Sequence, residues 1–288
     1  MNLIEFGDCR DTMRRWAADG VRVQACVTSP PYFGLRDYGH EGQIGLEQTP
    51  EEYIAAMVEV FRCVRDVLAD DGTLWLNIGD SYKANKQLQL IPARVAIALQ
   101  ADGWFLRQDI IWQKPNCMPS SVIDRCTSSH EHIFLLAKCP VYFFDHKAIQ
   151  EDAVSDHPSG NGFKRPERLS YQNADGTARG NEKQWSGVGG KRNKRDVWSV
   201  PVKPYTGAHF ATFPPALIEP CILAGSRPGD VVLDPFMGSG TTASVAIKYG
   251  RQYLGCELNP EYGALQQKRI QAANDNQPRN GDLFAAAS

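Results

Sequence analysis

The sequence lacks the features of a membrane protein, a secreted protein or a purely electrostatic nucleic-acid binder. No apolar run in its 288 residues approaches the ~20 residues that a membrane span needs. The amino terminus, Met1 to Glu5, has neither the basic start nor the apolar stretch of a signal peptide. Lysine and arginine total 31 against 33 aspartate and glutamate residues, so the formal net charge is −2. We therefore expect a soluble, cytoplasmic protein with no membrane partner and no global basic field.

Closely spaced cysteines are also missing. The eight cysteines occur singly, and none forms the Cys-x-x-Cys pair that zinc ribbons and redox sites need. His130-Glu131-His132 offers two imidazoles but no third ligand at a recognised spacing, so we expect a structural role rather than a metal site. The expectation is reduced, mostly buried thiols and no bound metal.

An alternation of strand and helix patterns is present, on an ordinary globular composition of 42% apolar and 22% charged residues. Thr49-Pro50-Glu51-Glu52 supplies an N-cap, a first-turn proline and a capping-box glutamate, which predict the start of the clearest helix. The patterns predict strands at 2–6, 24–28, 73–78, 105–112, 132–137, 231–234 and 253–257, and helices at 11–18, 50–68, 91–100, 215–224, 241–249 and from 260. This order predicts an α/β fold, an open and mostly parallel sheet with helices on both faces.

The segment 150–206 interrupts the alternation. Glycine, proline, serine, asparagine and charged residues dominate it, and no periodicity lasts long enough to predict a helix or strand. Residues 160–200 include nine lysines and arginines but only four acidic residues. The segment therefore carries a local basic patch that the whole-chain charge conceals.

The first motif that indicates chemistry is the glycine-rich stretch from Val232 to Thr242. An apolar strand runs into Gly238-x-Gly240 and then opens a helix, which is how α/β sheets build a ligand site at the carboxyl ends of their strands. Glu257 ends the next strand, as in dinucleotide-binding folds. The Gly-Lys-Ser/Thr ending of a phosphate-binding loop is absent. Alone, the motif leaves several nucleotide-type cofactors open.

The second motif is Thr28-Ser29-Pro30-Pro31-Tyr32, which follows a predicted strand. Two consecutive prolines cannot continue a strand, and their rings fix φ near −65°. The result is a stiff loop that presents a hydroxyl group, carbonyl oxygens and an aromatic ring.

Together, Asp-Pro-Phe-Met-Gly-Ser-Gly-Thr-Thr and the upstream Ser-Pro-Pro-Tyr resemble the DNA amino-methyltransferases that use S-adenosyl-L-methionine. The order of catalytic motif, basic stretch and cofactor motif is similar to the permuted β class, and the resemblance covers residues 2–270. It implies a Rossmann-like class I methyltransferase fold with a seven-stranded sheet, one strand of which is antiparallel. It also implies a catalytic half at 1–149, a small irregular target-recognition insert at 150–206, a cofactor-binding half at 207–272 and a flexible tail at 273–288.

The resemblance implies a set of cofactor-binding residues. Phe236, Gly238 and Gly240 would line the methionine end with Asp234 beneath them, Glu257 would hold the ribose hydroxyls, and Asp8 would approach the adenine. The segment before Pro214 resembles a further cofactor motif, and Asn77, Trp112 and Lys114 match looser motifs as pocket walls. The complete expected set is Asp8, Phe213, Asp234, Pro235, Phe236, Gly238, Ser239, Gly240, Thr241 and Glu257.

The same resemblance implies that Ser29, Pro30, Pro31 and Tyr32 form the catalytic loop. The base must leave the duplex, and Tyr32 would stack on it. Methylation of cytosine carbon 5 needs a cysteine nucleophile, but Pro220-Cys221 lies in a predicted helix, so the target is an exocyclic amino group. In this family, serine at the first loop position goes mostly with cytosine N4, which we favour over adenine N6. An RNA or protein amino-methyltransferase, a non-catalytic DNA-binding module and an NAD-dependent dehydrogenase remain alternatives.

The basic patch is expected to contact double-stranded DNA. Lysine and arginine side chains would bind phosphates, and we expect Lys191, Arg192, Lys194 and Arg195 to do so. A cognate restriction endonuclease is a candidate partner, and the enzyme would act as a monomer or a homodimer.

Overall fold

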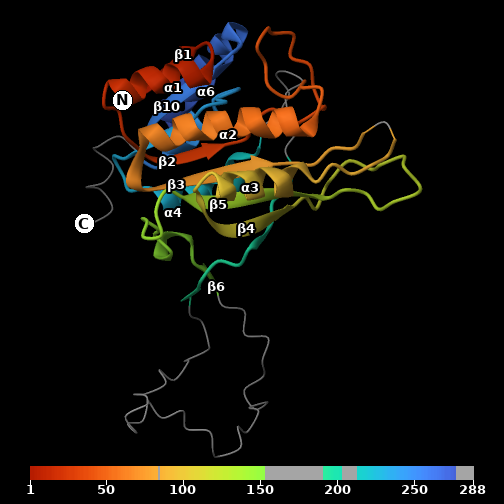
Figure 1. Cartoon of the computed structure of the whole chain (residues 1–288). Helices are drawn as coiled ribbons and strands as arrows, with labels where there is room; N and C mark the ends of the chain where they lie inside the picture. The colour runs from red at the N-terminus through yellow and green to blue at the C-terminus, as the bar shows by residue number, and fades with distance from the viewer. Residues whose placement is uncertain (84, 153–190, 203–212, 277–288) are drawn as a thin grey trace, which may run out of the picture. The chain divides into compact units, whose positions relative to one another are not determined.

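The computed structural model describes residues 1–83, 85–152, 191–202 and 213–276, and its main element is a mostly parallel sheet (Figure 1). Within these residues the sheet has eight strands in the order β1, β10, β9, β2, β3, β5, β4, β8. Their bounds are β1 Asn2–Phe6, β2 Val23–Thr28, β3 Leu68–Ile78, β4 Phe105–Gln113, β5 His130–Ala137, β8 Val197–Ser199, β9 Val231–Asp234 and β10 Gln252–Glu257. Neighbouring strands are parallel except at β5, which is antiparallel to both β3 and β4.

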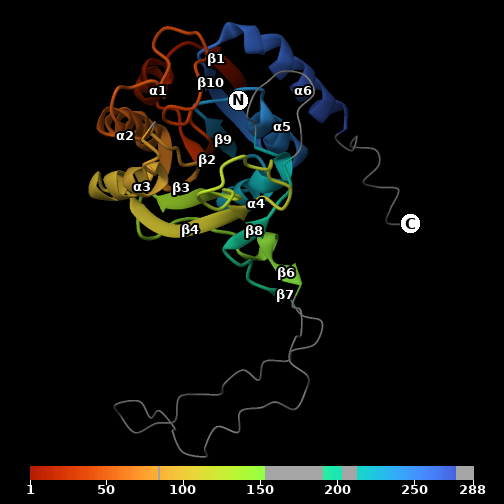
Figure 2. The same cartoon turned by 90° about the vertical axis from the view of Figure 1, so that its right-hand side faces the viewer.

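Helices cover both faces of this sheet, as the sequence predicts. Figure 2 shows α1 (Cys9–Ala18), α2 (Pro50–Val67) and α3 (Ile91–Ala101) on one face and α4 (Pro215–Gly225), α5 (Thr241–Lys248) and α6 (Gly263–Asp275) on the other. A short 3₁₀ turn, Pro260–Tyr262, precedes α6. The apolar sides of these helices therefore cover both faces of the sheet. No helix in the described ranges is long and apolar enough to cross a membrane.

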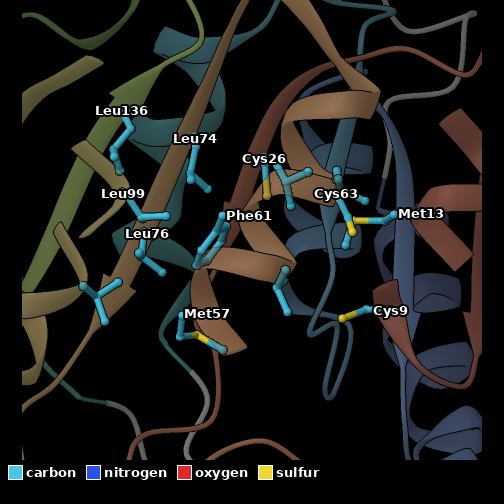
Figure 3. Packing of buried hydrophobic residues seen from close by; sticks show 14 of the residues in the cluster. Cys9, Met13, Cys26, Met57, Phe61, Cys63, Leu74, Leu76, Leu99 and Leu136 are labelled. Atoms are coloured by element: carbon cyan, nitrogen blue, oxygen red, sulfur yellow. The ribbon is translucent and has the colours of Figure 1, made fainter. Parts of the chain in front are cut away.

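The start of α2 has the predicted capping box. The Thr49 hydroxyl accepts a hydrogen bond from the Glu52 N–H at 3.2 Å, and the Glu52 carboxylate accepts one from the Thr49 N–H. Phe61 and Met57 on the buried face of α2 pack near Leu74 and Leu76 of β3 (Figure 3). The cap thus orients an apolar helix face onto the centre of the sheet.

Five of the eight cysteines are buried, and none forms a disulfide. This agrees with the expectation of mostly buried thiols.

Most predicted elements agree with the structure to within two residues, but two expectations are wrong. β3 begins at Leu68 rather than residue 73, because α2 ends at Val67 and the chain enters the sheet without a turn. Among the residues that the structure describes, the sheet also has eight strands rather than seven. The additional strand is the edge strand β8, which lies inside the segment expected to be irregular and pairs parallel with β4.

A three-residue strand has too short a pattern to be seen in sequence, and β8 is held largely by its position beside β4. The Ile111 N–H donates to the Asp196 carbonyl at 2.8 Å, and the Trp112 indole N–H donates to the Val200 carbonyl at 2.8 Å. Trp198 is buried on the same strand. This strand therefore forms because its backbone pairs with β4 and its tryptophan is buried, and not because its residues have a high strand propensity.

Residues Ile149–Lys194 form a separate compact unit. Its described part is a short antiparallel pair, β6 (Glu151–Asp152) with β7 (Lys191–Arg192). Five of the nine basic residues counted above lie outside the described residues, as do most of the expected tail and residues 203–212 of the segment before Pro214. The division of the chain into a catalytic half, a target-recognition region and a cofactor half stays a prediction.

Candidate active site

A cavity of about 260 Å³ opens at the carboxyl ends of the parallel strands. Residues that follow β1, β2, β9 and β10 line it, including Asp8, Ser29, Phe236 and Asn259. The antiparallel β5 contributes Glu131 from its amino-terminal end instead. Both sequence motifs therefore meet at one edge of the sheet, where open α/β sheets bind ligands.

Asp234 anchors the glycine-rich turn from below. Its carboxylate is 1% exposed; Oδ1 accepts from the Thr28 hydroxyl at 2.6 Å, and Oδ2 accepts from the Thr242 hydroxyl at 2.6 Å. The Phe236 N–H adds a third bond to Oδ1 at 3.0 Å. Burial raises the pKa of Asp234 to about 6, although the three hydrogen bonds act in the opposite direction. Asp234 thus ties the turn to β2 and α5, and it does not line the cavity.

The turn itself has the backbone conformation that requires glycine. Gly238 and Gly240 have φ values of 53° and 84°, in the left-handed region. Pro235, Phe236, Gly238 and Ser239 line the cavity, as does Phe213 ahead of α4.

Gly240 and Thr241 do not line the cavity, contrary to the expectation that Gly240 faces the ligand. Gly240 is the N-cap of α5, and a Cβ there would lie 3.5 Å from the Cα of Gln266. The hydroxyls of Thr241 and Ser239 instead accept hydrogen bonds from the Arg269 guanidinium of α6. Gly240 and Thr241 thus set the helix start that supports the turn.

Two acidic residues stand at neighbouring strand ends. Glu257 is 8% exposed and accepts from the Gly238 N–H at 2.7 Å and the Asn259 N–H at 2.9 Å; burial raises its pKa. Asp8 caps α1 through the Arg10 N–H at 2.8 Å and forms an ion pair with the Arg10 guanidinium, which lowers the pKa of Asp8. These carboxylates and the Phe236 ring suit a nucleoside, because carboxylate oxygens accept ribose or amino hydrogens and an aromatic ring contacts a flat base.

The Ser-Pro-Pro-Tyr loop borders the same cavity. Helix α2 holds it, since the Tyr53 hydroxyl donates to the Pro31 carbonyl at 2.9 Å. The Tyr32 ring lies against the backbone of Gly79, where a Cβ would be only 2.6 Å from the Tyr32 Cε2 atom. Ser29, Pro30, Pro31 and Tyr32 all line the cavity.

A polar network that sequence reasoning missed lies behind Tyr32. The Tyr32 hydroxyl donates to Glu131 Oε2 at 2.7 Å, and Asn77 Nδ2 donates to the same oxygen at 2.8 Å. Lys114 pairs with the other oxygen, Oε1, and its ammonium lies 4.4 Å from the centre of the Trp112 ring. The sequence signal for this network was weak. It consisted of Glu131, an acidic residue at the start of a predicted core strand.

The residues expected to bind DNA do not line this cavity. Lys191 and Arg192 form ion pairs with Asp152 at 2.6 Å and Glu151 at 2.9 Å inside the small unit. Lys194 belongs to the same unit, whereas Arg195 belongs to the main one. No group of three potential metal ligands occurs within the described ranges.

The comparison with known families decides the class of this site. The N6/N4-type DNA methylase family matches residues 23–268. The chain belongs to this family. It is 45% identical to the type II methyltransferase M.XycI of Xanthomonas campestris pv. cyanopsidis, over 94% of this chain and 88% of that protein. It is also 44% identical to the type II methyltransferase M.SmaI of Serratia marcescens, over 93% of this chain and 90% of that protein.

Solved structures share the methyltransferase fold. PvuII DNA methyltransferase (cytosine-N4-specific) superposes with a TM-score of 0.67 at 19% identity, covering 99% of this chain and 90% of that one. M1.HpyAVI, solved in complex with SAM, gives a TM-score of 0.59 at 18% identity, covering 94% of this chain and 99% of that one. These structures show the Rossmann-like class I fold. The family match and the type II relatives show that this DNA methylase acts on amino groups of DNA.

Proposed function

We propose that this DNA methylase transfers a methyl group from S-adenosyl-L-methionine to the N4 amino group of a cytosine flipped out of double-stranded DNA. The observation that carries the choice of base is Ser29, a neutral hydroxyl at the first position of the catalytic loop, inside the cavity. The Tyr32 hydroxyl links Ser29 to the Glu131 carboxylate, so an acidic group lies near the loop although its first residue is neutral. The shared fold with PvuII methyltransferase, which is named as cytosine-N4-specific, gives further support.

The residues that would hold the cofactor lie at the glycine-rich turn and the two acidic strand ends. Glu257 would accept hydrogen bonds from the ribose hydroxyls, Asp8 would face the adenine, and Phe236 would contact the bound molecule beside the backbone of Gly238 and Ser239. When bound, the cofactor supplies an electrophilic methyl group on a positively charged sulfur. The glycine-rich turn would let the backbone approach this molecule without side-chain obstruction.

The catalytic loop positions the target amino group. The NH₂ donates to the Ser29 hydroxyl oxygen and to the Pro30 carbonyl, which draws the nitrogen toward tetrahedral geometry and frees its lone pair. Tyr32 stacks on the face of the base, with its ring held against Gly79. The rate enhancement comes mainly from positioning and electrostatics. Because a duplex hides this amino group, the base must be flipped out first.

The region 150–206 selects the DNA site, and Lys191, Arg192, Lys194 and Arg195 contact phosphates. The local excess of basic residues supports this assignment. The type II relatives support a cognate restriction endonuclease as the functional partner.

The deciding experiment is nucleoside mass spectrometry of DNA methylated by the purified enzyme. We expect N4-methylcytosine; N6-methyladenine would overturn the choice of base. Ser29→Ala removes one hydrogen bond to the amino group, so single-turnover transfer should fall about ten- to a hundredfold, the equivalent of 1–3 kcal/mol. Cofactor affinity, measured by calorimetry, should not change. A Ser29→Ala enzyme with the full transfer rate would contradict the placement of the base.

A further inference from the structure

Methylation of an amino group leaves one proton too many, and the cavity contains a route for it. The methylated amino nitrogen carries one more proton than the neutral product base. We propose that Glu131 is the final acceptor of this proton, which reaches it through the Ser29 and Tyr32 hydroxyls. This inference rests on the proposed placement of the amino group at Ser29, and it holds for cytosine and adenine alike.

The hydroxyl groups form a continuous path. The Ser29 hydroxyl donates to the Tyr32 hydroxyl oxygen at 3.3 Å, and the Tyr32 hydroxyl donates to Glu131 Oε2 at 2.7 Å. With its own hydrogen directed at Tyr32, the Ser29 oxygen presents its lone pairs for the target amino group. A proton taken from that nitrogen therefore has two hydroxyl relays before a carboxylate.

Asn77 sets the direction of this path. Its side chain is buried, and Nδ2 donates to the Tyr32 hydroxyl oxygen at 2.6 Å and to Glu131 Oε2 at 2.8 Å. The opposite amide orientation would place Oδ1 against the carboxylate, so Glu131 dictates the one observed. As a consequence, Oδ1 is buried without a hydrogen-bond partner in the described part of the chain. Because an ionised carboxylate can only accept, the hydrogen of the Tyr32 hydroxyl goes to Glu131, and the Tyr32 oxygen accepts from Asn77 and Ser29.

The groups around the path suit Tyr32 as a relay and leave one oxygen of Glu131 to accept. Burial, and then the nearby Glu131 charge, raise the pKa of Tyr32 well above its usual value, so Tyr32 relays a proton and does not remain ionised. Lys114 pairs with Glu131 Oε1, and Oε2 faces the Tyr32 hydroxyl. Among the described residues, the groups that face Glu131 are Tyr32 from the loop after β2, Asn77 from β3 and Lys114 from the end of β4.

The proton transfer balances. The N–H bond of the methylated nitrogen breaks as Ser29 Oγ gains that proton, Ser29 gives its own proton to Tyr32, and Tyr32 gives its proton to Glu131 Oε2. The nitrogen keeps the electron pair of the broken bond. The products are a neutral methylated base, two neutral hydroxyls and a protonated Glu131, which later releases its proton to solvent.

The test is single-turnover methyl transfer at pH 7.5 and saturating cofactor, measured in H₂O and in D₂O. The wild-type rate should be lower in D₂O, because proton transfer along the path is slower with deuterium. Glu131→Gln should lower the rate about a hundredfold and abolish this solvent isotope effect, as loss of a proton acceptor does. Tyr32→Phe keeps the ring but interrupts the path, so it should show the same two changes. Glu219→Gln, which breaks a Glu–Lys pair on α4, is the matched control and should behave like the wild type.

A second readout separates the relay from a structural role. Cofactor affinity by calorimetry and DNA affinity by fluorescence anisotropy should stay within about twofold of wild type in Glu131→Gln and Tyr32→Phe. A wild-type rate and solvent isotope effect in either variant would overturn the relay, and so would a lower rate with the isotope effect retained. If the wild-type product is N6-methyladenine, the proposed base is wrong while the isotope comparison still tests the relay.

Discussion

Replacing Thr242 by valine should show how much the buried carboxylate of Asp234 depends on each of its donors. The Thr242 hydroxyl is the donor to Oδ2 at 2.6 Å, whereas Oδ1 receives both the Thr28 hydroxyl and the Phe236 N–H. Valine has the shape of threonine without the hydroxyl, so Thr242→Val leaves one oxygen of a buried charge without that donor. A hydrogen bond to a charged group contributes about 1.5–3 kcal/mol to stability, and we expect a loss of this size. Thr28→Val, the matched variant, should cost about 1 kcal/mol because Oδ1 keeps one donor.

The loss of stability in Thr242→Val should also depend on pH. Because burial raises the pKa of Asp234 from 3.8 to about 6, the folded state binds this proton more tightly than the unfolded state. The contribution of Asp234 to stability therefore decreases as the pH rises from 4 to 6. Thr242→Val removes a bond that lowers this pKa, so the variant should lose most stability where the carboxylate is ionised, above pH 7, and less at pH 5.

Urea unfolding of both valine variants at pH 5 and pH 7.5 provides the measurement. The free energy of unfolding should fall more for Thr242→Val than for Thr28→Val, with the larger difference at pH 7.5. Equal losses for the two variants, or a loss that does not change with pH, would refute the assignment of Asp234 as an ionised anchor of the turn.

Other variants test separate parts of the fold and the site. Gly240→Val places a branched residue at φ 84° against Gln266, and calorimetry should show that cofactor binding fails; normal affinity would mean that the turn tolerates the strain. Thr49→Ala removes the N-cap of α2 and should lower the free energy of unfolding by about 1 kcal/mol in urea, while methyl transfer at saturating substrate stays unchanged. Gly79→Ala brings a Cβ to 2.6 Å from the Tyr32 ring, so single-turnover transfer should drop about tenfold by displacing the ring, the equivalent of 1.4 kcal/mol; an unchanged rate would show that the ring can move aside.

Local patterns in the sequence were sufficient for most of the fold. The cap at Thr49, the apolar spacing along α2 and the strand that ends at Asp234 each depend on neighbours within a few residues, and each appears in the structure as predicted. The expected order of strands and helices led to the correct fold class for the same reason. The short strand β8 escaped prediction because its stability comes from the edge of β4, far away in sequence.

The two motifs were likewise visible in sequence, since glycine and proline restrict the backbone wherever they occur. They indicated that a cofactor and a second ligand meet at the strand ends. The distinction between Gly238, which lines the cavity, and Gly240, which caps α5, needed the three-dimensional arrangement. The place of Asp234 beneath the turn was already implied by the family resemblance, whereas its bonds to Thr28 and Thr242 needed the structure.

The class of fold, the two motifs and the kind of reaction that they imply could be predicted from the sequence, because each depends on the spacing of nearby residues. The contacts of the Tyr32 hydroxyl could not, because they depend on how distant strands are arranged in the sheet. β5 runs antiparallel to its neighbours, so its first residues lie at the same edge as the last residues of the parallel strands. That reversal brings Glu131 to a tyrosine 99 positions earlier in the chain, where no sequence pattern could place it.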